Sequence, residues 1–145
     1  MQDPKIIPAT AADYAELILV WEASVRATHD FLTETDILTY KQLILEQYFD
    51  QLSLYCIKEN SGITGFIGVD NEFLQMLFIH PSKRGTGLGK ALIRYATSNL
   101  SVTKVDVNEQ NLQAVGFYHH LGFEAVEWFD HDAAGKPYPI VSMSL

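Results

Sequence analysis

The sequence predicts an α/β protein of the α+β kind, with a mixed, mostly antiparallel central sheet and helices on both faces. Three observations predict this fold class. Apolar residues recur at helical spacing in four segments, seven stretches are rich in branched and aromatic residues, and short turns join three of those stretches in succession. The resulting order, β-α-α-β-β-β-α-β-α-β-β, is typical of a sheet with helices packed against it.

The first third of the chain predicts a short strand at residues 5–7 and two helices. Thr10 and Asp13 have the spacing of a capping box at the first helix, and Thr33 is the predicted N-cap of the second. The segment ATHDFL, residues 27–32, breaks the helical pattern between them. The first helix presents Tyr14, Leu17, Ile18, Trp21 and Val25 on one face, and the second carries Ile37, Lys41, Ile44 and Tyr48.

The middle and end of the chain predict the sheet. Strands at 52–60, 63–70 and 72–80 are separated by short turns, which implies an antiparallel meander. A helix with an inner face of Leu88, Leu92, Tyr95 and Ala96, a strand at 103–108, a helix at 111–121, and strands at 123–129 and 138–145 complete the order. Gly122 is the predicted stop of the last helix.

Length, charge and cysteine content narrow the function classes. The 145 residues predict one domain, 1–145, and the net charge of −8 disfavours a nucleic-acid partner. An acidic surface suits an amine substrate, although solubility alone also explains it. With Cys56 as the single cysteine, neither a disulfide nor a cysteine zinc site is expected, and we expect no metal. The absence of an apolar signal or membrane-length segment predicts a cytoplasmic protein.

The stretch RGTGLGK, residues 84–90, places three glycines between an apolar strand and an amphipathic helix. Exposed N–H groups at a helix N-terminus, approached over bare glycine backbone, form a site for phosphate. The spacing does not match a Walker A loop, because Arg84 stands at the first glycine position and Ala91 at the hydroxyl position. A Rossmann loop would need glycine in place of Lys90. A tight turn without a ligand is the alternative.

The segment RGTGLG resembles the [Q/R]-x-x-G-x-[G/A] signature of the GNAT superfamily of acetyl-CoA-dependent N-acetyltransferases, with Arg84, Gly87 and Gly89 at the specified places. LFIHP, residues 77–81, resembles the strand that leads into that loop. NEQNLQAVGFYHHLGF, residues 108–123, resembles the family's second motif, an asparagine-opened helix that carries Phe-Tyr. SVRATHDFL and GKPYPIVSMSL are similar to segments of a branch of small bacterial members.

The resemblance implies acetyl-CoA as cofactor, with CoA as product. Its diphosphate would lie on the backbone of residues 84–90, and its pantetheine arm between the strands at 72–80 and 103–108. The N–H of Leu77 or Phe78 would polarise the thioester. The implied cofactor-binding residues are Leu77, Phe78, Ile79, Arg84, Gly85, Thr86, Gly87, Leu88, Gly89, Lys90 and Asn111.

The resemblance also implies that Tyr118 is the acid that protonates the departing thiolate, although its apolar neighbours also fit a core tyrosine. Many relatives carry a carboxylate base on the strand at 72–80, but this chain has Gln75 there, and an amide is not basic. His29, in the break between the first two helices, is the candidate base. A surface or helix-capping histidine, Glu72 as base, and a water chain are alternatives.

The leading hypothesis is an acyltransferase that moves an acetyl group from acetyl-CoA to a primary amine of a small molecule or peptide by direct attack in a ternary complex. A non-catalytic acyl-CoA sensor or scaffold, and an interaction protein that kept the fold alone, are the alternatives. A homodimer is possible because relatives often form dimers. Aromatic residues available to shape an acceptor pocket are Phe31, Tyr40, Phe49, Trp128 and Tyr138.

Overall fold

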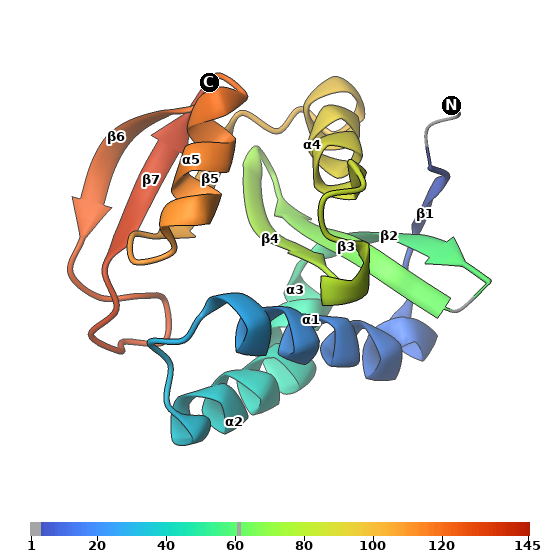
Figure 1. Ribbon diagram of the computed structural model, residues 1–145, viewed down its shortest axis with the longest axis horizontal. Coiled ribbons are helices and arrows are strands. Elements are labelled where there is room, and N and C mark those ends of the chain that lie inside the picture. The colour runs from blue at the N-terminus through green and yellow to red at the C-terminus, as the bar shows by residue number, and fades with distance from the viewer. Residues whose placement is uncertain (1–3, 61) are drawn as a thin grey trace.

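The computed structural model describes residues 4–60 and 62–145, in which the elements follow the predicted order (Figure 1). Within these residues the strands are β1 (Ile6–Pro8), β2 (Ser53–Glu59), β3 (Gly62–Asp70), β4 (Phe73–Ile79), β5 (Lys104–Asn108), β6 (Glu124–Phe129) and β7 (Ile140–Ser144). The helices are α1 (Tyr14–Thr28), α2 (Glu34–Leu43), α3 (Phe49–Gln51), α4 (Leu88–Asn99) and α5 (Leu112–His120), with short turns η1 (Ala11–Asp13), η2 (Ile44–Tyr48) and η3 (Pro81–Lys83).

The described strands form one sheet in the order β1-β2-β3-β4-β5-β7-β6. The β4–β5 pair is parallel, and the other neighbouring pairs are antiparallel. Helices α1 to α3 cover the β2–β4 half on one face, and α4 and α5 cover the opposite face (Figure 1). The predicted fold class is therefore confirmed, with one apolar core on each side of the sheet.

The predicted helix starts are found where the sequence places them. The Thr10 N–H donates to Asp13 Oδ2 over 2.9 Å, and the Asp36 N–H donates to Thr33 Oγ1 over 3.0 Å. The second predicted helix differs in its last part, because Ile44–Tyr48 wind as a π turn. A π turn adds a residue per turn, and apolar spacing over five residues does not distinguish it from an α-helix.

A β-bulge in β4 is the feature that positions the site. Gly68 pairs with Met76 and Val69 pairs with Leu74, so Gln75 is an extra residue in the β3–β4 ladder. The β4–β5 pairing covers residues 73–74 of β4 and ends directly before Gln75. Bulges bend a strand and terminate pairing. From Gln75 onward β4 stays with β3 and diverges from β5, which opens a wedge in the sheet.

A substitution in the core beneath α4 tests how this helix packs on the sheet. Leu92 is fully buried between α4 and the sheet, whereas Leu112 on α5 is 78% exposed. We expect Leu92→Ala to lower the free energy of unfolding by about 2–5 kcal/mol, because a cavity replaces a buried side chain. Leu112→Ala, the matched control, should change it by less than about 0.5 kcal/mol. Urea unfolding followed by circular dichroism measures both, and equal effects would contradict the described packing.

Candidate functional site

The wedge between β4 and β5 continues into a pocket of about 770 Å³ that reaches both layers of helices. From the α4–α5 side it is lined by the glycine loop and by Phe117 and Tyr118. From the α1–α2 side it is lined by residues that include Trp21, His29 and Tyr40. One continuous space therefore connects the two faces of the sheet, which is what two substrates that meet inside a protein require.

The glycine loop forms an open cradle at the start of α4. Gly85 and Gly87 have φ values of 77° and 86°, and no atom lies within 4 Å of a Cβ built at either position. The Ala91 N–H donates to the Gly87 carbonyl, so the N–H groups of residues 88–90 precede the first intrahelical bond. An anion bound there would meet these N–H groups with the positive end of the helix dipole behind them.

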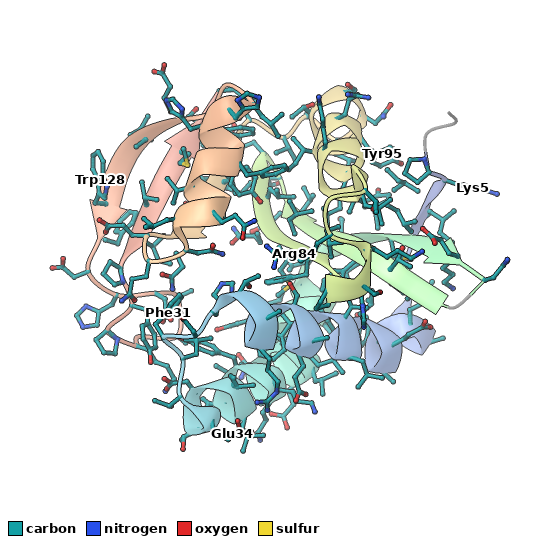
Figure 2. The ribbon with its side chains drawn as sticks, viewed as in Figure 1. Lys5, Phe31, Glu34, Arg84, Tyr95 and Trp128 are labelled. Atoms are coloured by element: carbon teal, nitrogen blue, oxygen red, sulfur yellow. The ribbon has the colours of Figure 1, made fainter. Side chains whose placement is uncertain are left out.

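Arg84 connects the cradle to α5. Its guanidinium donates to Gln113 Oε1 in the first turn of α5, across the mouth of the wedge (Figure 2). Of the residues that the sequence singled out for the cofactor, all line the pocket except Thr86. The Thr86 hydroxyl donates instead to the Lys83 carbonyl and closes the turn.

The β3–β4 ladder determines which backbone groups of β4 face the wedge. The His80 N–H donates to the Thr64 carbonyl over 2.8 Å, and the same register continues to Phe66 opposite Phe78. Because hydrogen-bonded and non-bonded pairs alternate in an antiparallel ladder, the backbone of Phe78 faces β3. The N–H and C=O of Leu77 and Ile79 point the other way, into the wedge. Phe78 therefore reaches the pocket through its side chain and not its backbone.

Tyr118 lines the wedge from α5 and is 6% exposed. Its ring packs edge-on against Phe117 and Phe123, at centroid distances of 5.2 and 5.7 Å. Burial raises the pKa of its phenol well above the ordinary value of 10, so the hydroxyl stays protonated at neutral pH. Among the described residues, none is found to accept a hydrogen bond from this hydroxyl. Tyr118 therefore has the buried ring of a core tyrosine, and it also carries a protonated hydroxyl on a residue that lines the pocket.

His29 is held by a chain of hydrogen bonds that determines which ring nitrogen carries the proton. The single hydroxyl proton of Thr28 goes to the Ser24 carbonyl over 2.9 Å. Nδ1 of His29 lies 2.7 Å from the same oxygen, and a hydroxyl that donates to the carbonyl accepts from Nδ1. This leaves Nε2 as the acceptor, and it lies 3.5 Å from Nδ2 of Asn111. His29 is also the C-cap residue of α1, where its backbone N–H donates to the Val25 carbonyl over 2.7 Å, and its side chain lines the pocket.

Asn111 connects the two layers around this histidine. Its Oδ1 accepts the Ala114 N–H over 3.2 Å and caps α5, which directs its amide nitrogen toward His29. Tyr118 lies two helical turns further on, about 10 Å along the axis. Because side chains of a helix lean toward its N-terminus, the phenol of Tyr118 leans back in the direction of Asn111. Both groups belong to one face of α5.

The pKa of His29 is lowered to about 4, because burial disfavours the charged imidazolium, and the nearby Asp30 only partly opposes this. The ring is therefore neutral at neutral pH. A neutral imidazole with a free Nε2 can accept a proton but holds it weakly.

The other residues that the sequence analysis considered lie partly at the pocket and partly away from it. Tyr40 lines the pocket, Phe49 is 1% exposed in the core, and Trp128 is 60% exposed on β6. Glu72 forms an ion pair with Lys104 over 3.1 Å, and Cys56 is buried.

No group of His, Cys, Asp and Glu that could hold a metal is found among residues 4–60 and 62–145. In that same part of the chain, no helix has the length and apolar character that a membrane span requires.

Sequence reasoning missed Thr28, Gln113 and Asp132. All three line the pocket. Each acts by a hydrogen bond to another residue of the site: Thr28 to His29, Gln113 to Arg84, and Asp132 to Tyr40. Thr28 stands next to His29 in the sequence, so this adjacency is the one signal that could have identified it. Gln113 and Asp132 have no comparable local signal, because Gln113 meets Arg84 and Asp132 meets Tyr40 only after folding.

Comparison with known proteins gives the family and the fold. Residues 31–138 match the family described as the acetyltransferase (GNAT) domain. The chain is 35% identical over 130 residues to peptidyl-lysine N-acetyltransferase YjaB of Escherichia coli strain K12, which covers 89% of this chain and 88% of that protein. The expected resemblance to small bacterial members is thereby confirmed.

Solved structures agree. The solution structure of the apo form of YjaB from Escherichia coli has a TM-score of 0.85 and 33% identity, and covers 97% of this chain and 95% of that one. The PaiA N-acetyltransferase from Thermoplasma acidophilum, in complex with coenzyme A, has a TM-score of 0.73 at 20% identity, and covers 99% of this chain and 100% of that one. The second likeness supports the fold.

Two glycine substitutions test the strained geometry of the cradle. We expect Gly87→Ala to lower the free energy of unfolding by about 1–2 kcal/mol, because its φ of 86° is unfavourable for a residue with a Cβ. Gly116→Ala is the matched control, since it also has open space but no positive φ. It should raise stability by about 0.5–1 kcal/mol through helix propensity. Urea unfolding measures both, and the same sign for both would contradict the assignment.

The pH dependence of His29 is a second test. Its pKa of about 4 lies below the ordinary value of 6.5, so the unfolded chain binds this proton more readily than the folded one. The free energy of unfolding should therefore fall as the pH drops from about 6.5 to 4, and His29→Gln should remove this part of the dependence. NMR titration of the ring signals gives the midpoint. A midpoint near 6.5 would show that the ring is not buried as described.

Proposed function

This chain belongs to the GNAT acetyltransferase family and is an acetyl-CoA-dependent N-acetyltransferase, and we propose that its acceptor is the side-chain amine of lysine in a peptide or protein. The observation that carries the proposal is the wedge that opens at Gln75. It has an anion cradle on one side of the sheet and His29 on the other. An acyl donor and an amine can enter from opposite faces and meet inside.

The cradle and the wedge fit the two parts of acetyl-CoA. The diphosphate would lie on the N–H groups of residues 84–90, with Arg84 and Lys90 at the rim. The pantetheine arm would extend along β4 like an added strand. Its amides would bind the backbone groups of Leu77 and Ile79, which face the wedge. Asn111 lies at the end of this path.

The chemistry uses one donor for each developing charge. The Leu77 N–H would donate to the thioester oxygen as the tetrahedral intermediate forms, which is commonly worth a few kcal/mol. The amine nitrogen attacks the acetyl carbon, and the carbon–sulfur bond then breaks. Tyr118 would give its proton to the departing sulfur, CoA leaves as the thiol, and water would return a proton to the phenolate.

His29 would take the proton that the amine releases. Once the nitrogen has attacked the carbonyl, it is a stronger acid than a free ammonium, so a weakly basic imidazole is a suitable acceptor. Nε2 is unprotonated because Thr28 holds the proton side of the ring. The low pKa of His29 means that the proton passes on to water rather than remaining on the ring. This assignment takes the place of the carboxylate that is absent at Gln75.

The lining on the α1–α2 side supports lysine as acceptor. Apolar and aromatic side chains predominate there, namely Trp21, Val25, Leu32, Tyr40, Ile44, Tyr48, Met76 and Phe78. Such a wall fits the four methylene groups of a lysine side chain. The YjaB relatives carry the name peptidyl-lysine N-acetyltransferase, and the net charge of −8 favours a cationic partner. A homodimer and a cytoplasmic location stay predictions.

An acceptor panel tests the proposal. The protein is mixed with acetyl-CoA and with peptides that contain free lysine, acetylated lysine or only a free N-terminus, and with small amines. Thiol release and mass spectrometry of the peptides should show acetylation at free lysine. Modification of small amines alone would overturn the lysine assignment. Coenzyme A binding without turnover on any amine would favour the alternative function, an acyl-CoA sensor.

The role of Tyr118 gives a prediction for kinetics. We expect Tyr118→Phe to lower kcat by about tenfold, a modest effect because a thiol with a pKa near ~8.5 is already a good leaving group. Coenzyme A affinity, measured by calorimetry, should change by less than about twofold, since the ring and its packing remain. Tyr95→Phe is the control, because Tyr95 lies on α4 and packs against Tyr55 of β2. Unchanged turnover in Tyr118→Phe would remove the assigned role.

A further inference from the structure

The connection between β6 and β7, residues 130–139, folds down onto the start of α2, and we name it the anchored loop. Figure 1 shows it passing from the far edge of the sheet to the end of the α1–α2 connection. Asp132 and Ala133 of this loop line the pocket on the same side as His29, Leu32 and Tyr40. The loop therefore forms part of the wall around the acceptor end of the pocket.

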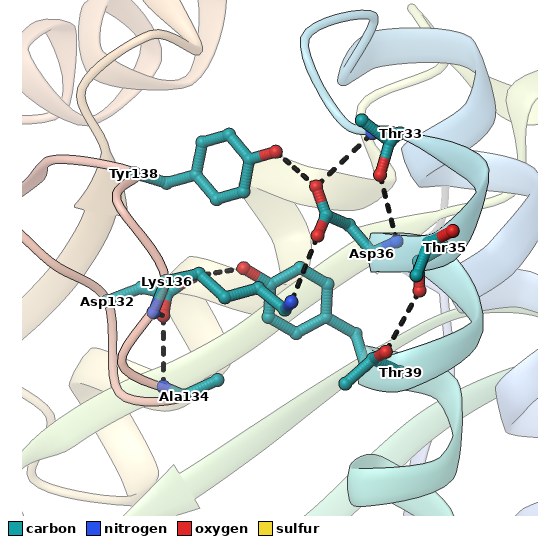
Figure 3. A network of polar contacts seen from close by, with 9 residues as sticks. Thr33, Thr35, Asp36, Thr39, Asp132, Ala134, Lys136 and Tyr138 are labelled. Atoms are coloured by element: carbon teal, nitrogen blue, oxygen red, sulfur yellow. Dashed lines mark hydrogen bonds and ion pairs between the residues drawn. The ribbon is translucent and has the colours of Figure 1, made fainter.

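Asp36 in the first turn of α2 is the centre of the contact (Figure 3). Its Oδ1 lies 3.0 Å from the ammonium of Lys136, and its Oδ2 accepts the hydroxyl of Tyr138. The Thr33 N–H also donates to Oδ2, over 3.3 Å. Asp36 as a residue is 9% exposed, and its side chain is 13% exposed. One buried carboxylate thus caps α2 and binds two residues of a loop about a hundred positions away.

The loop is also braced from within and from a second point of α2. Oδ1 of Asp132 accepts the N–H groups of Ala134 and Lys136, each over 3.0 Å, and its Oδ2 accepts the hydroxyl of Tyr40. The Lys136 ammonium lies 5.9 Å from the centre of the Tyr40 ring. The bonds of Asp132 within the loop fix its turn, and the contacts with Tyr40 attach the loop to α2.

The contact at Asp36 extends to the candidate base. The ring of Tyr138 packs on Phe31 at a centroid distance of 5.7 Å, and Phe31 packs on His29 at 5.3 Å. Charge supports the arrangement: the hydrogen bond from Tyr138, the ammonium of Lys136 and the Thr33 contacts outweigh burial and lower the pKa of Asp36 to about 2. The carboxylate is therefore ionised at neutral pH.

We propose that Asp36 is a positioning residue for the acceptor: it binds Lys136 and Tyr138 and so holds residues 130–139 as the wall of the acceptor end, beside His29. This inference rests on the proposed function for the identity of the acceptor but not for the anchoring itself. The contacts proposed for the diphosphate lie on the opposite face of the sheet, in the loop at 84–90, and the anchored loop supplies none of the residues proposed for the cofactor. Loss of the contacts at Asp36 should therefore weaken binding of the acceptor and leave the affinity for coenzyme A unchanged.

Kinetics with a panel of variants test the proposal. Asp36→Asn keeps the size and a capping oxygen but loses the charge, and we expect it to raise the KM for the acceptor about tenfold or more. The Kd for coenzyme A should stay within about twofold. Lys136→Met should act like Asp36→Asn, whereas Lys136→Arg should keep most of the affinity because it keeps the ion pair. Glu34→Gln is the matched control in the same turn of α2, since Glu34 pairs with Arg26 away from the loop.

Hydrogen–deuterium exchange tests the anchoring without any acceptor. Faster exchange in residues 130–139 of Asp36→Asn, but not of Glu34→Gln, is the expected result. Unchanged exchange there, or an equal loss of coenzyme A and acceptor affinity in folded Asp36→Asn, would overturn the inference. If the unmodified protein acetylates a small amine and no lysine peptide, the KM comparison is made with that amine. The proposed acceptor is then wrong, and the positioning role is still decided.

Discussion

The constraint on which the site depends is that β4 and β5 pair for only two residues. Parallel neighbours in a sheet normally continue side by side, with their backbone groups satisfied by each other. Here the extra residue Gln75 redirects β4 along β3 and leaves the wedge-facing groups of Leu77 and Ile79 without a strand partner. Those groups need hydrogen bonds, and an extended ligand that carries amides can supply them.

The wedge also joins two layers of the molecule that offer different chemistry. The α4–α5 layer provides backbone N–H groups and an arginine, which suit a phosphate. The α1–α2 layer provides an apolar wall and a neutral histidine, and the anchored loop between β6 and β7 packs against it. This side would suit an amine on an apolar arm. Helix α5 connects the two, because Asn111 at its start contacts His29 and Tyr118 two turns later lines the wedge.

Buried and half-buried polar groups determine the geometry of the α1–α2 side of the pocket. Thr28 determines the tautomer of His29, and Asp36 joins α2 to a loop from the far end of the chain. Each of these groups has its partners, so each costs little to bury and holds one geometry. The site is therefore built from short local elements that long-range polar contacts bring into register.

The sequence by itself determined the element order, the capping box at Thr10, the N-cap at Thr33 and the glycine loop, because spacing and residue type act over a few positions. The family resemblance supplied Tyr118 and His29 as the candidate pair. The sequence did not determine that Gln75 is a bulge, that the backbone of Phe78 faces β3, or that Thr86 turns away from the pocket. Strand register, the tautomer of His29 and the Asp36 contact were decided only by the tertiary structure. The physical reason is that each depends on a partner distant in the chain, and local pattern carries no information about which distant group will be opposite.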